Sequence, residues 1–134
     1  MKNNSLQFLI LSIFLTSCGG GGGSSLELTV QQFSTFSVNE DDNFQTVISS
    51  STNKPANITY TISKPSANAN VTISNSGALF YSPQPNYYGN DTFSITVIAT
   101  PEGQTGSYES KTLNVNATVI SVNDPPTITI NDDL

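Results

Sequence analysis

One stretch, residues 81–99, constrains the fold of this chain more than any other. Two prolines, an asparagine and a glycine make its first part, from Tyr81 to Gly89, a turn-rich corner. In its second part apolar residues occupy every second position from Phe93 to Ala99, with hydroxyl side chains between the first of them. Successive side chains of a strand point to opposite faces, so this pattern predicts a strand that is buried on one face. An aromatic corner that leads into such a strand is typical of a β-sandwich.

The same alternation recurs along the rest of the chain. It is clear at Ile58, Tyr60 and Ile62, and again from Leu113 to Val119. Shorter extended segments are predicted at residues 26–33, 36–38, 44–48, 71–73 and 79–81, with polar loops at 49–55 and 65–70. The sequence therefore predicts an all-β domain over residues 26–124, with about seven or eight short strands and no helix.

The last strand carries an irregularity. Ile120 and Val122 fall out of phase with the apolar positions that end at Val119. One extra residue in a strand moves all later side chains to the other face, so we predict a β-bulge near Val119. Before this strand, residues 101–106 are expected to form a loose hairpin loop that contains two glycines.

Composition argues against several classes of function. Only 10% of the residues are charged, the formal net charge is −6, and arginine and histidine are absent. Nucleic acid is therefore not expected as a partner, because phosphate binding needs clustered cations. Without histidine, a Ser-His-Asp or Cys-His catalytic set is impossible. The acidic residues form no recognisable glycosidase pair either, so we predict a non-catalytic protein.

The N-terminal residues 1–17 have the pattern of an export signal. Lys2 precedes an apolar run, residues 6–15, that is too short to span a membrane comfortably. The run ends in Leu15-Thr16-Ser17-Cys18, which resembles the bacterial lipobox. This resemblance implies cleavage before Cys18 and a covalent lipid on its thiol. The alternative is an ordinary secretory signal followed by a chance cysteine. Cys18 is the only cysteine, so no intrachain disulfide can form.

A Gly/Ser segment, residues 18–25 with the lipidated cysteine, is predicted to tether the domain to the membrane. Two or more acyl chains, at about 0.8 kcal/mol per buried CH₂, would hold it stably. Gly19 stands where an aspartate tends to retain lipoproteins in the inner membrane, so the sequence resembles the outer-membrane pattern. We therefore expect a lipid-anchored protein of the bacterial cell envelope, at the outer membrane.

Three segments together resemble one family, the bacterial cadherin-like and Ig-like tandem repeats. The first is the acidic opening Val38-Asn39-Glu40-Asp41. The second, residues 81–93, fits the pattern Y-x-P followed by N-(F/Y)-x-G-x-D-x-F, and the third, residues 122–126, fits V-N-D-x-P. The resemblance implies a Greek-key β-sandwich of about seven strands. It also implies a surface module that serves in adhesion or as a spacer, with neighbouring repeats or surface ligands as partners.

In that family calcium stiffens the junction between repeats. By position, the resemblance implies that Glu40, Asn123 and Asp124 are ligands, with Asp41 as a further candidate. The family's mid-domain acidic pair is missing here, because residues 66–70 offer only the amides of two asparagines. Fewer carboxylates imply weak binding, at or beyond dissociation constants of about 10⁻⁴–10⁻³ M. The alternatives are a solvated acidic turn and an Asx turn before proline.

The corner itself has two interpretations. The family pattern assigns Tyr81, Tyr88, Gly89, Asp91 and Phe93 to a structural corner, in which the Asp91 carboxylate caps backbone amides. The alternative is a carbohydrate-binding module in which the tyrosines of this corner form a sugar-stacking platform. Tyr108, before the last strand, is the better candidate for an exposed aromatic residue.

The final segment, residues 125–134, is expected to be a linker and the start of a truncated second repeat. Two prolines cannot continue a β-ladder, so they should end the domain. After them, residues 127–130 alternate like a new first strand, and residues 130–133 echo the acidic opening at residues 38–41.

Overall fold

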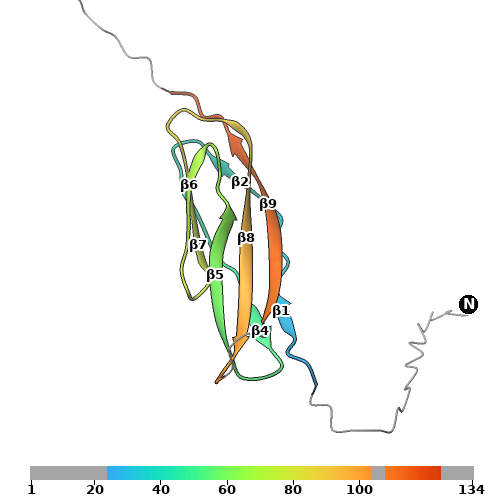
Figure 1. The fold of residues 1–134 in the computed structure, drawn as a ribbon. Coiled ribbons are helices and arrows are strands. Elements are labelled where there is room, and N and C mark those ends of the chain that lie inside the picture. Colours follow the sequence, from blue (N-terminus) through green and yellow to red (C-terminus); the bar gives the residue numbers. More distant parts are fainter. Residues whose placement is uncertain (1–23, 104–107, 125–134) are drawn as a thin grey trace, which may run out of the picture.

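The structure, a computed structural model, describes residues 24–103 and 108–124. All of its regular elements are β-strands, and none of the described residues forms a helix that could cross a membrane. Nine strands follow one another along the chain (Figure 1): β1 Leu28–Val30, β2 Thr35–Asn39, β3 Phe44–Val47, β4 Ser50–Thr52, β5 Ala56–Lys64, β6 Ala69–Ile73, β7 Ala78–Pro83, β8 Gly89–Pro101 and β9 Glu109–Ile120.

The strands form two facing layers. One layer is a four-stranded sheet in the order β2-β9-β8-β5, in which β2 and β9 run parallel and the other pairs run antiparallel. The other layer contains the three-stranded sheet β3-β7-β6 and the small pair β1-β4. The chain therefore starts in one layer with β1 and changes to the other layer with β2.

Two of the nine strands are parts of one interrupted strand. Between β3 and β4, the Ile48 N–H donates to the Gly77 carbonyl at 2.9 Å, and the Ser49 carbonyl accepts from the Gln31 N–H at 2.8 Å. These bonds continue the pairing with β7 on one side and with β1 on the other. The all-β sandwich predicted from the alternation is thus confirmed. Nine strands are present rather than the predicted seven or eight, because β3 and β4 count separately although they continue one another.

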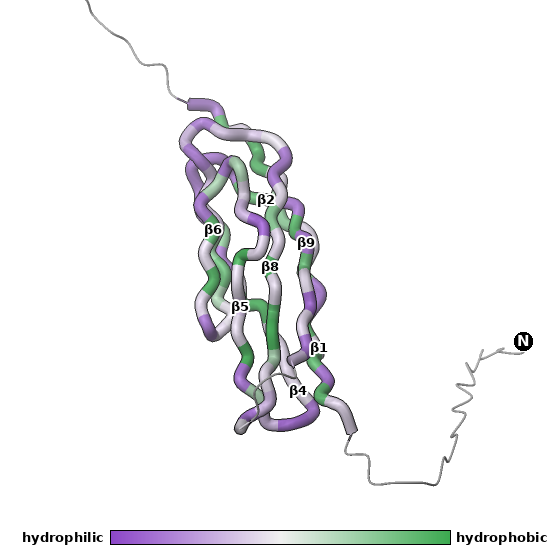
Figure 2. The backbone as a smooth tube through the Cα atoms, viewed as in Figure 1, coloured by the Kyte–Doolittle hydropathy of each residue, from purple (hydrophilic) through white to green (hydrophobic). Residues whose placement is uncertain are grey.

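The core lies between the layers and is built by the alternating positions. The apolar residues at every second position of β8 from Phe93 to Ala99 and of β9 from Leu113 to Val119 are buried. Aromatic rings link the layers at one end: Phe36 of β2 stacks on Phe44 of β3 with ring centroids 4.0 Å apart. Figure 2 shows the matching alternation of hydrophobic and hydrophilic positions along the tube. The outward positions of β8 and β9 carry mostly Ser, Thr and Asn.

Three local predictions differ from the structure. Residues 50–52, predicted as loop, form β4, because the hydroxyl-rich sequence has no apolar alternation but still pairs with β1. β6 begins at Ala69, within a predicted loop. The β-bulge near Val119 is wrong: β9 pairs without a shift up to Ile120, and the sheet ends there.

Ile120 and Val122 are out of phase for a simpler reason than a bulge. Ile120 takes an outward position of β9 and its side chain is 47% exposed, whereas Val122 follows the end of the strand and its side chain is 45% exposed. The irregularity of the four-stranded sheet lies instead in β5, where the register shifts between Ile62 and Lys64. The predicted signal, the Cys18 lipidation site, residues 104–106 of the hairpin loop and the second repeat lie outside the described residues.

Candidate functional site

Two buried carboxylates lie at the end of the sandwich from which the chain leaves. We call this the linker end, and it comprises residues 39–43, 86–91 and 119–124. Glu40 is 5% exposed and Asp91 is 4% exposed. Burying a carboxylate is costly unless it is hydrogen-bonded, so the partners of these two side chains define what this end does.

Glu40 lies in a tight turn directly after β2. The Asp42 N–H donates to the Asn39 carbonyl at 3.3 Å, and the Asn39 amide donates to the Asp42 carboxylate at 3.1 Å. Asp41 adopts φ +67°, a left-handed conformation that aspartate tolerates better than most residues. The turn directs the Glu40 side chain inward, toward the segment that follows β9.

The Glu40 carboxylate binds the backbone of the exit segment. The Glu40 N–H donates to the Ile120 carbonyl at 2.8 Å, as the next step of the β2–β9 ladder. One residue pair further on, the Val122 N–H donates to Glu40 Oε1 at 2.6 Å. A side chain thus replaces the backbone at the point where the sheet ends, and it links residues 82 positions apart in the sequence.

The other candidate calcium ligands lie in the two segments that this contact joins, but they face solvent. Asp41, Asn123 and Asp124 are all exposed. The described residues contain no group of three or more acidic, histidine or cysteine side chains placed to hold a metal ion. Calcium takes about 6–8 oxygen ligands, so these side chains provide only part of a coordination shell. A complete site would need oxygen atoms from outside the described domain.

Asp91 joins three segments of the fold. Its Oδ2 accepts hydrogen bonds from the Tyr81 hydroxyl of β7, at 2.8 Å, and from the Ser66 hydroxyl in the loop after β5. Its Oδ1 accepts from the Thr92 N–H at 2.9 Å, and Ser66 in turn accepts from the Asn68 N–H at 3.1 Å. Burial, together with the adjacent Asp91, raises the pKa of Tyr81 far above its usual value. The carboxylate is enclosed by structural donors and has no open side for a substrate.

The remaining corner residues divide between the core and the surface. Phe93 is buried beside Tyr81, with ring centroids 5.8 Å apart. Gly89 adopts φ +123°, which side-chain-bearing residues rarely adopt. The Tyr87 hydroxyl donates to the Asn90 carbonyl at 2.7 Å and braces the corner from outside. Tyr88 is 66% exposed and therefore lies outside the core.

The two most exposed tyrosines are far apart. Tyr88 precedes Gly89, the first residue of β8, whereas Tyr108 precedes Glu109, which pairs with Ala99 near the other end of β8. Ten residues of strand separate these positions, which corresponds to about 33 Å. Tyr88 and Tyr108, the latter 65% exposed, therefore cannot stack on the same sugar ring.

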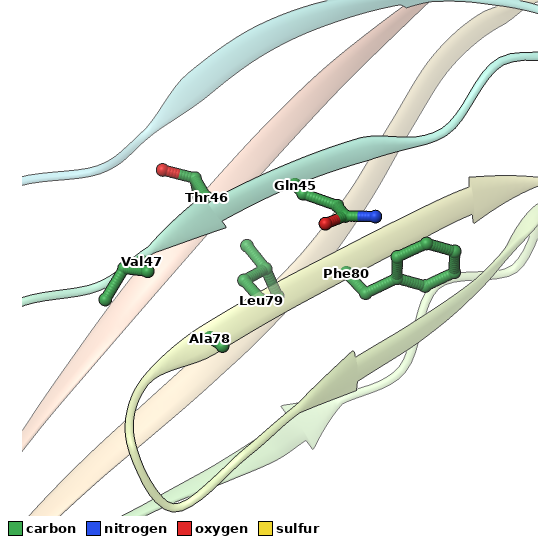
Figure 3. Close-up of a pocket in the computed structure, with 6 residues that line it drawn as sticks. All are labelled: Gln45, Thr46, Val47, Ala78, Leu79 and Phe80. Atoms are coloured by element: carbon green, nitrogen blue, oxygen red, sulfur yellow. The ribbon is translucent and has the colours of Figure 1, made fainter.

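A shallow hollow lies over the outer face of β3 and β7 (Figure 3). Its volume is about 370 Å³, and its lining comes from two neighbouring strands: Gln45, Thr46, Val47, Ala78, Leu79 and Phe80. Leu79 is buried, whereas Val47 is largely exposed. The lining contains no acid, base or thiol, so the hollow offers no group for proton transfer or nucleophilic attack.

Sequence reasoning missed the partners of both carboxylates. Ser66 lies in a segment without any periodic pattern, and the Val122 N–H is a backbone group. No local signal identifies either, because both contacts depend on the tertiary arrangement. Only knowledge that residues 35–39 pair in parallel with residues 116–120 would have placed Glu40 close to Val122.

Comparison with known proteins identifies the domain. The family model described as bacterial Ig domain matches residues 27–118, which is more than half of the chain. Comparison with curated proteins finds no match. The matched residues cover all strands of the sandwich except the last two positions of β9. By this match and by its two-layered all-β fold, the chain belongs to the bacterial Ig domain family.

Proposed function

We propose that this chain is a non-catalytic spacer module, anchored to the bacterial envelope by lipid on Cys18. One observation carries the proposal: the described chain enters the sandwich at one end, before β1, and leaves it at the opposite end, after β9 (Figure 1). Membership of a bacterial Ig family is consistent with a surface module that is not an enzyme.

The geometry suits a spacer because the long axis of the sandwich follows its strands. β8 alone contains 13 residues, which corresponds to about 43 Å of strand. A partner attached after Asp124 would therefore be held roughly that far from the entry point. The contact between Glu40 and Val122 supports this role, since it fixes the direction of the exit segment.

The anchor would keep this rod close to a membrane. Leu28, the first strand residue, lies ten positions after Cys18, and ten residue steps can span at most about 36 Å. A lipidated Cys18 would thus hold the entry end near the lipid surface and leave the linker end pointing away. We propose the outer membrane as the site of attachment, on the strength of Gly19 after the cysteine.

Labelling with an alkyne-bearing fatty acid in a bacterial host tests the anchor. The full chain should incorporate the label and sediment with the membranes. The Cys18→Ser variant is the matched control, and it should lose both the label and the membrane association. An unlabelled wild-type chain in the soluble periplasmic fraction would contradict the proposal.

Calcium binding at the linker end is a second part of the proposal. Asp41 and Asp124 carry exposed carboxylates in the two segments that the Glu40 contact joins. They would hold the ion only together with oxygen atoms from a following segment, because the described ligand set is incomplete. Calcium would then stiffen the junction rather than support a reaction.

A further inference from the structure

We propose that the hollow over β3 and β7 binds a neutral carbohydrate chain, with Phe80 as the ring on which one sugar stacks. This function goes beyond that of a spacer. It rests on the described residues of the three-stranded sheet, and it does not depend on lipid at Cys18. The site is also distinct from the tyrosines of the corner, since none of them lines the hollow.

Phe80 differs from the other phenylalanines of the domain. It is the one phenylalanine within residues 24–103 and 108–124 that lies outside the core cluster. Its neighbours Leu79 and Tyr81 are buried, so the Phe80 side chain points to the outer face of β7, the middle strand of its sheet. Core packing therefore does not explain this half-buried aromatic ring. The other four belong to the core or pack against it: Phe33, Phe36, Phe44 and Phe93.

Polar side chains flank the Phe80 ring on both neighbouring strands. The register places Gln45 of β3 directly opposite Phe80 on one side and Thr72 of β6 on the other. Side chains that are directly opposite share one face of the sheet, with Cβ atoms about 4.5–5.5 Å apart. Figure 3 shows the Gln45 amide beside the Phe80 ring. Gln45 and Thr72 are exposed, so an amide and a hydroxyl are available to a ligand placed on the ring.

The space beside the ring has the size of a small binding site. Two positions before Phe80, Ala78 has a side chain too short to fill the space on that face, and its partner Val47 is 57% exposed. The resulting hollow of about 370 Å³ is at the lower end of the range for small-molecule sites, about 300–1,000 Å³. Because it is shallow, it can cover only one side of a ligand. This suits an extended chain laid across the strands.

The types of group in the hollow match the two kinds of surface on a sugar. A sugar ring presents C–H groups on its faces and hydroxyl groups around its rim. The face of an aromatic ring carries partial negative charge, so Phe80 can attract the C–H groups. The Gln45 amide and the Thr72 hydroxyl each donate and accept hydrogen bonds, so they can bind hydroxyl groups at the rim.

The absence of charge selects a neutral ligand. None of the six residues that line the hollow is charged, and the whole chain has a formal net charge of −6. An anionic ligand would lose hydration here without a cation in compensation, and the net charge would repel it. A purely apolar ligand would leave the Gln45 amide covered and without a hydrogen-bond partner. A neutral carbohydrate avoids both penalties.

The outer face of the four-stranded sheet lacks this combination. Its polar side chains bond one another: the Ser94 hydroxyl donates to the Asn114 amide oxygen at 2.8 Å, and the Thr96 and Thr112 hydroxyls lie 3.1 Å apart. The outward positions between Asn90 and Thr118 on β8 and β9 carry no aromatic residue. A stacking site is therefore expected on the β3–β7 face alone.

Amide NMR spectra of the full chain test the proposal, with Cys18→Ser to exclude a lipid. The chain is titrated with three neutral oligosaccharides, cellohexaose, mannohexaose and chitohexaose, and with the anionic hexagalacturonate. At least one neutral oligosaccharide should produce saturable shifts at Gln45, Thr72 and Phe80, whereas hexagalacturonate should produce none. No saturable shift with any of the three, or shifts centred on Tyr88 or Tyr108, would overturn the proposal.

Substitutions separate stacking from general packing. Phe80→Leu keeps an apolar side chain but no aromatic face, and it should raise the dissociation constant about twofold to tenfold. Phe80→Tyr should retain binding, and Tyr108→Ala, which removes an exposed ring outside the hollow, should leave it unchanged. Urea denaturation shows whether each variant is folded.

Gln45→Leu gives an independent test that leaves Phe80 in place. It removes the amide at similar side-chain size, so it should also weaken binding of the oligosaccharide. Equal affinity in the wild-type chain and in folded Phe80→Leu and Gln45→Leu would overturn the proposal. Shifts at this face that depend on protein concentration, without any sugar present, would show instead that a second copy of the chain occupies the hollow.

Discussion

Different kinds of hydrogen-bonding group stabilise the two ends of the sandwich. At the linker end, the buried carboxylates of Glu40 and Asp91 bind distant parts of the chain. At the opposite end, which we call the tether end, the contacts are neutral. There the Tyr60 and Ser50 hydroxyls lie 2.5 Å apart, and the Asn53 amide group bonds the backbone on both sides of Leu26.

The difference shows what a buried charge provides in a small β-domain. A carboxylate accepts several hydrogen bonds, and each bond to a charged group contributes about 1.5–3 kcal/mol, against about 1 kcal/mol for a neutral pair. Few residues can therefore fix a loop, a corner and an exit segment. The stability of the fold then depends on every donor, because a buried charge without its partners is strongly unfavourable.

Removal of the Asp91 carboxylate should have the largest effect. Asp91→Ala deletes three hydrogen bonds and leaves the buried Tyr81 hydroxyl without its acceptor. We expect the free energy of unfolding to fall by roughly 3–5 kcal/mol, measured by urea denaturation. Tyr81→Phe removes one donor only and should cost less. A loss below about 1 kcal/mol in Asp91→Ala would show that the corner is held by packing instead.

A matched glycine pair tests the tether end. Gly77 has φ +80°, and a Cβ there would lie 2.4 Å from the Ile48 carbonyl oxygen. Gly103 has a similar φ, +72°, but such a Cβ would lie within 4 Å of no atom of the described residues, its chain neighbours apart. Gly77→Ala should cost roughly 2–4 kcal/mol in thermal unfolding, and Gly103→Ala about 1 kcal/mol, the left-handed penalty alone. Equal costs would mean that the contact near Ile48 relaxes freely.

Alkaline pH should weaken the linker end through Tyr81. Its pKa is raised in the folded state by burial and by Asp91, so the folded protein holds this proton more tightly than the unfolded chain. The stabilisation is complete below the unfolded pKa of about 10 and is lost as pH rises above it, by at most about 1.4 kcal/mol per pH unit. Urea denaturation between pH 9 and about 11 should show this slope. Tyr81→Phe should flatten it, and an unchanged slope in that variant would assign the effect to another group.

Calcium should have the smallest effect, and only at the linker end. With a dissociation constant near 1 mM, about 10 mM calcium would stabilise the folded state by about 1.4 kcal/mol. Thermal unfolding of the full chain with calcium and with magnesium measures this directly. A shift that survives in the Asp41→Asn, Asp124→Asn double variant would argue against these ligands.

The sequence predicted the strands whose inner positions are apolar. β8 and β9 carry their core residues at every second position, so periodicity alone located them. It failed for β4, whose Ser-Ser-Thr sequence contributes hydrogen bonds to β1 but no apolar side chain. It also failed after Val119, because Ile120 is an outward position of β9 and Val122 is an exposed residue beyond the end of the strand.

The linker end was only partly predictable for a different reason. The acidic opening, the corner and the linker motif marked the important residues, including Glu40 and Asp91. Their partners depend on tertiary contacts: Ser66 is 25 residues from Asp91, and Val122 is 82 residues from Glu40. A single sequence contains the residue types but not the pairing of β2 with β9 that brings them together.

Amide hydrogen exchange at Val122 tests the central claim most directly, since the claim is that the buried Glu40 carboxylate fixes the exit of the chain. In the wild-type protein we predict that the Val122 N–H exchanges much more slowly than that of the exposed Asp124. In Glu40→Ala the Val122 N–H should exchange as fast as its exposed neighbour, while the amides of β8 stay protected. A Val122 N–H that is unprotected in the wild-type protein would contradict the account.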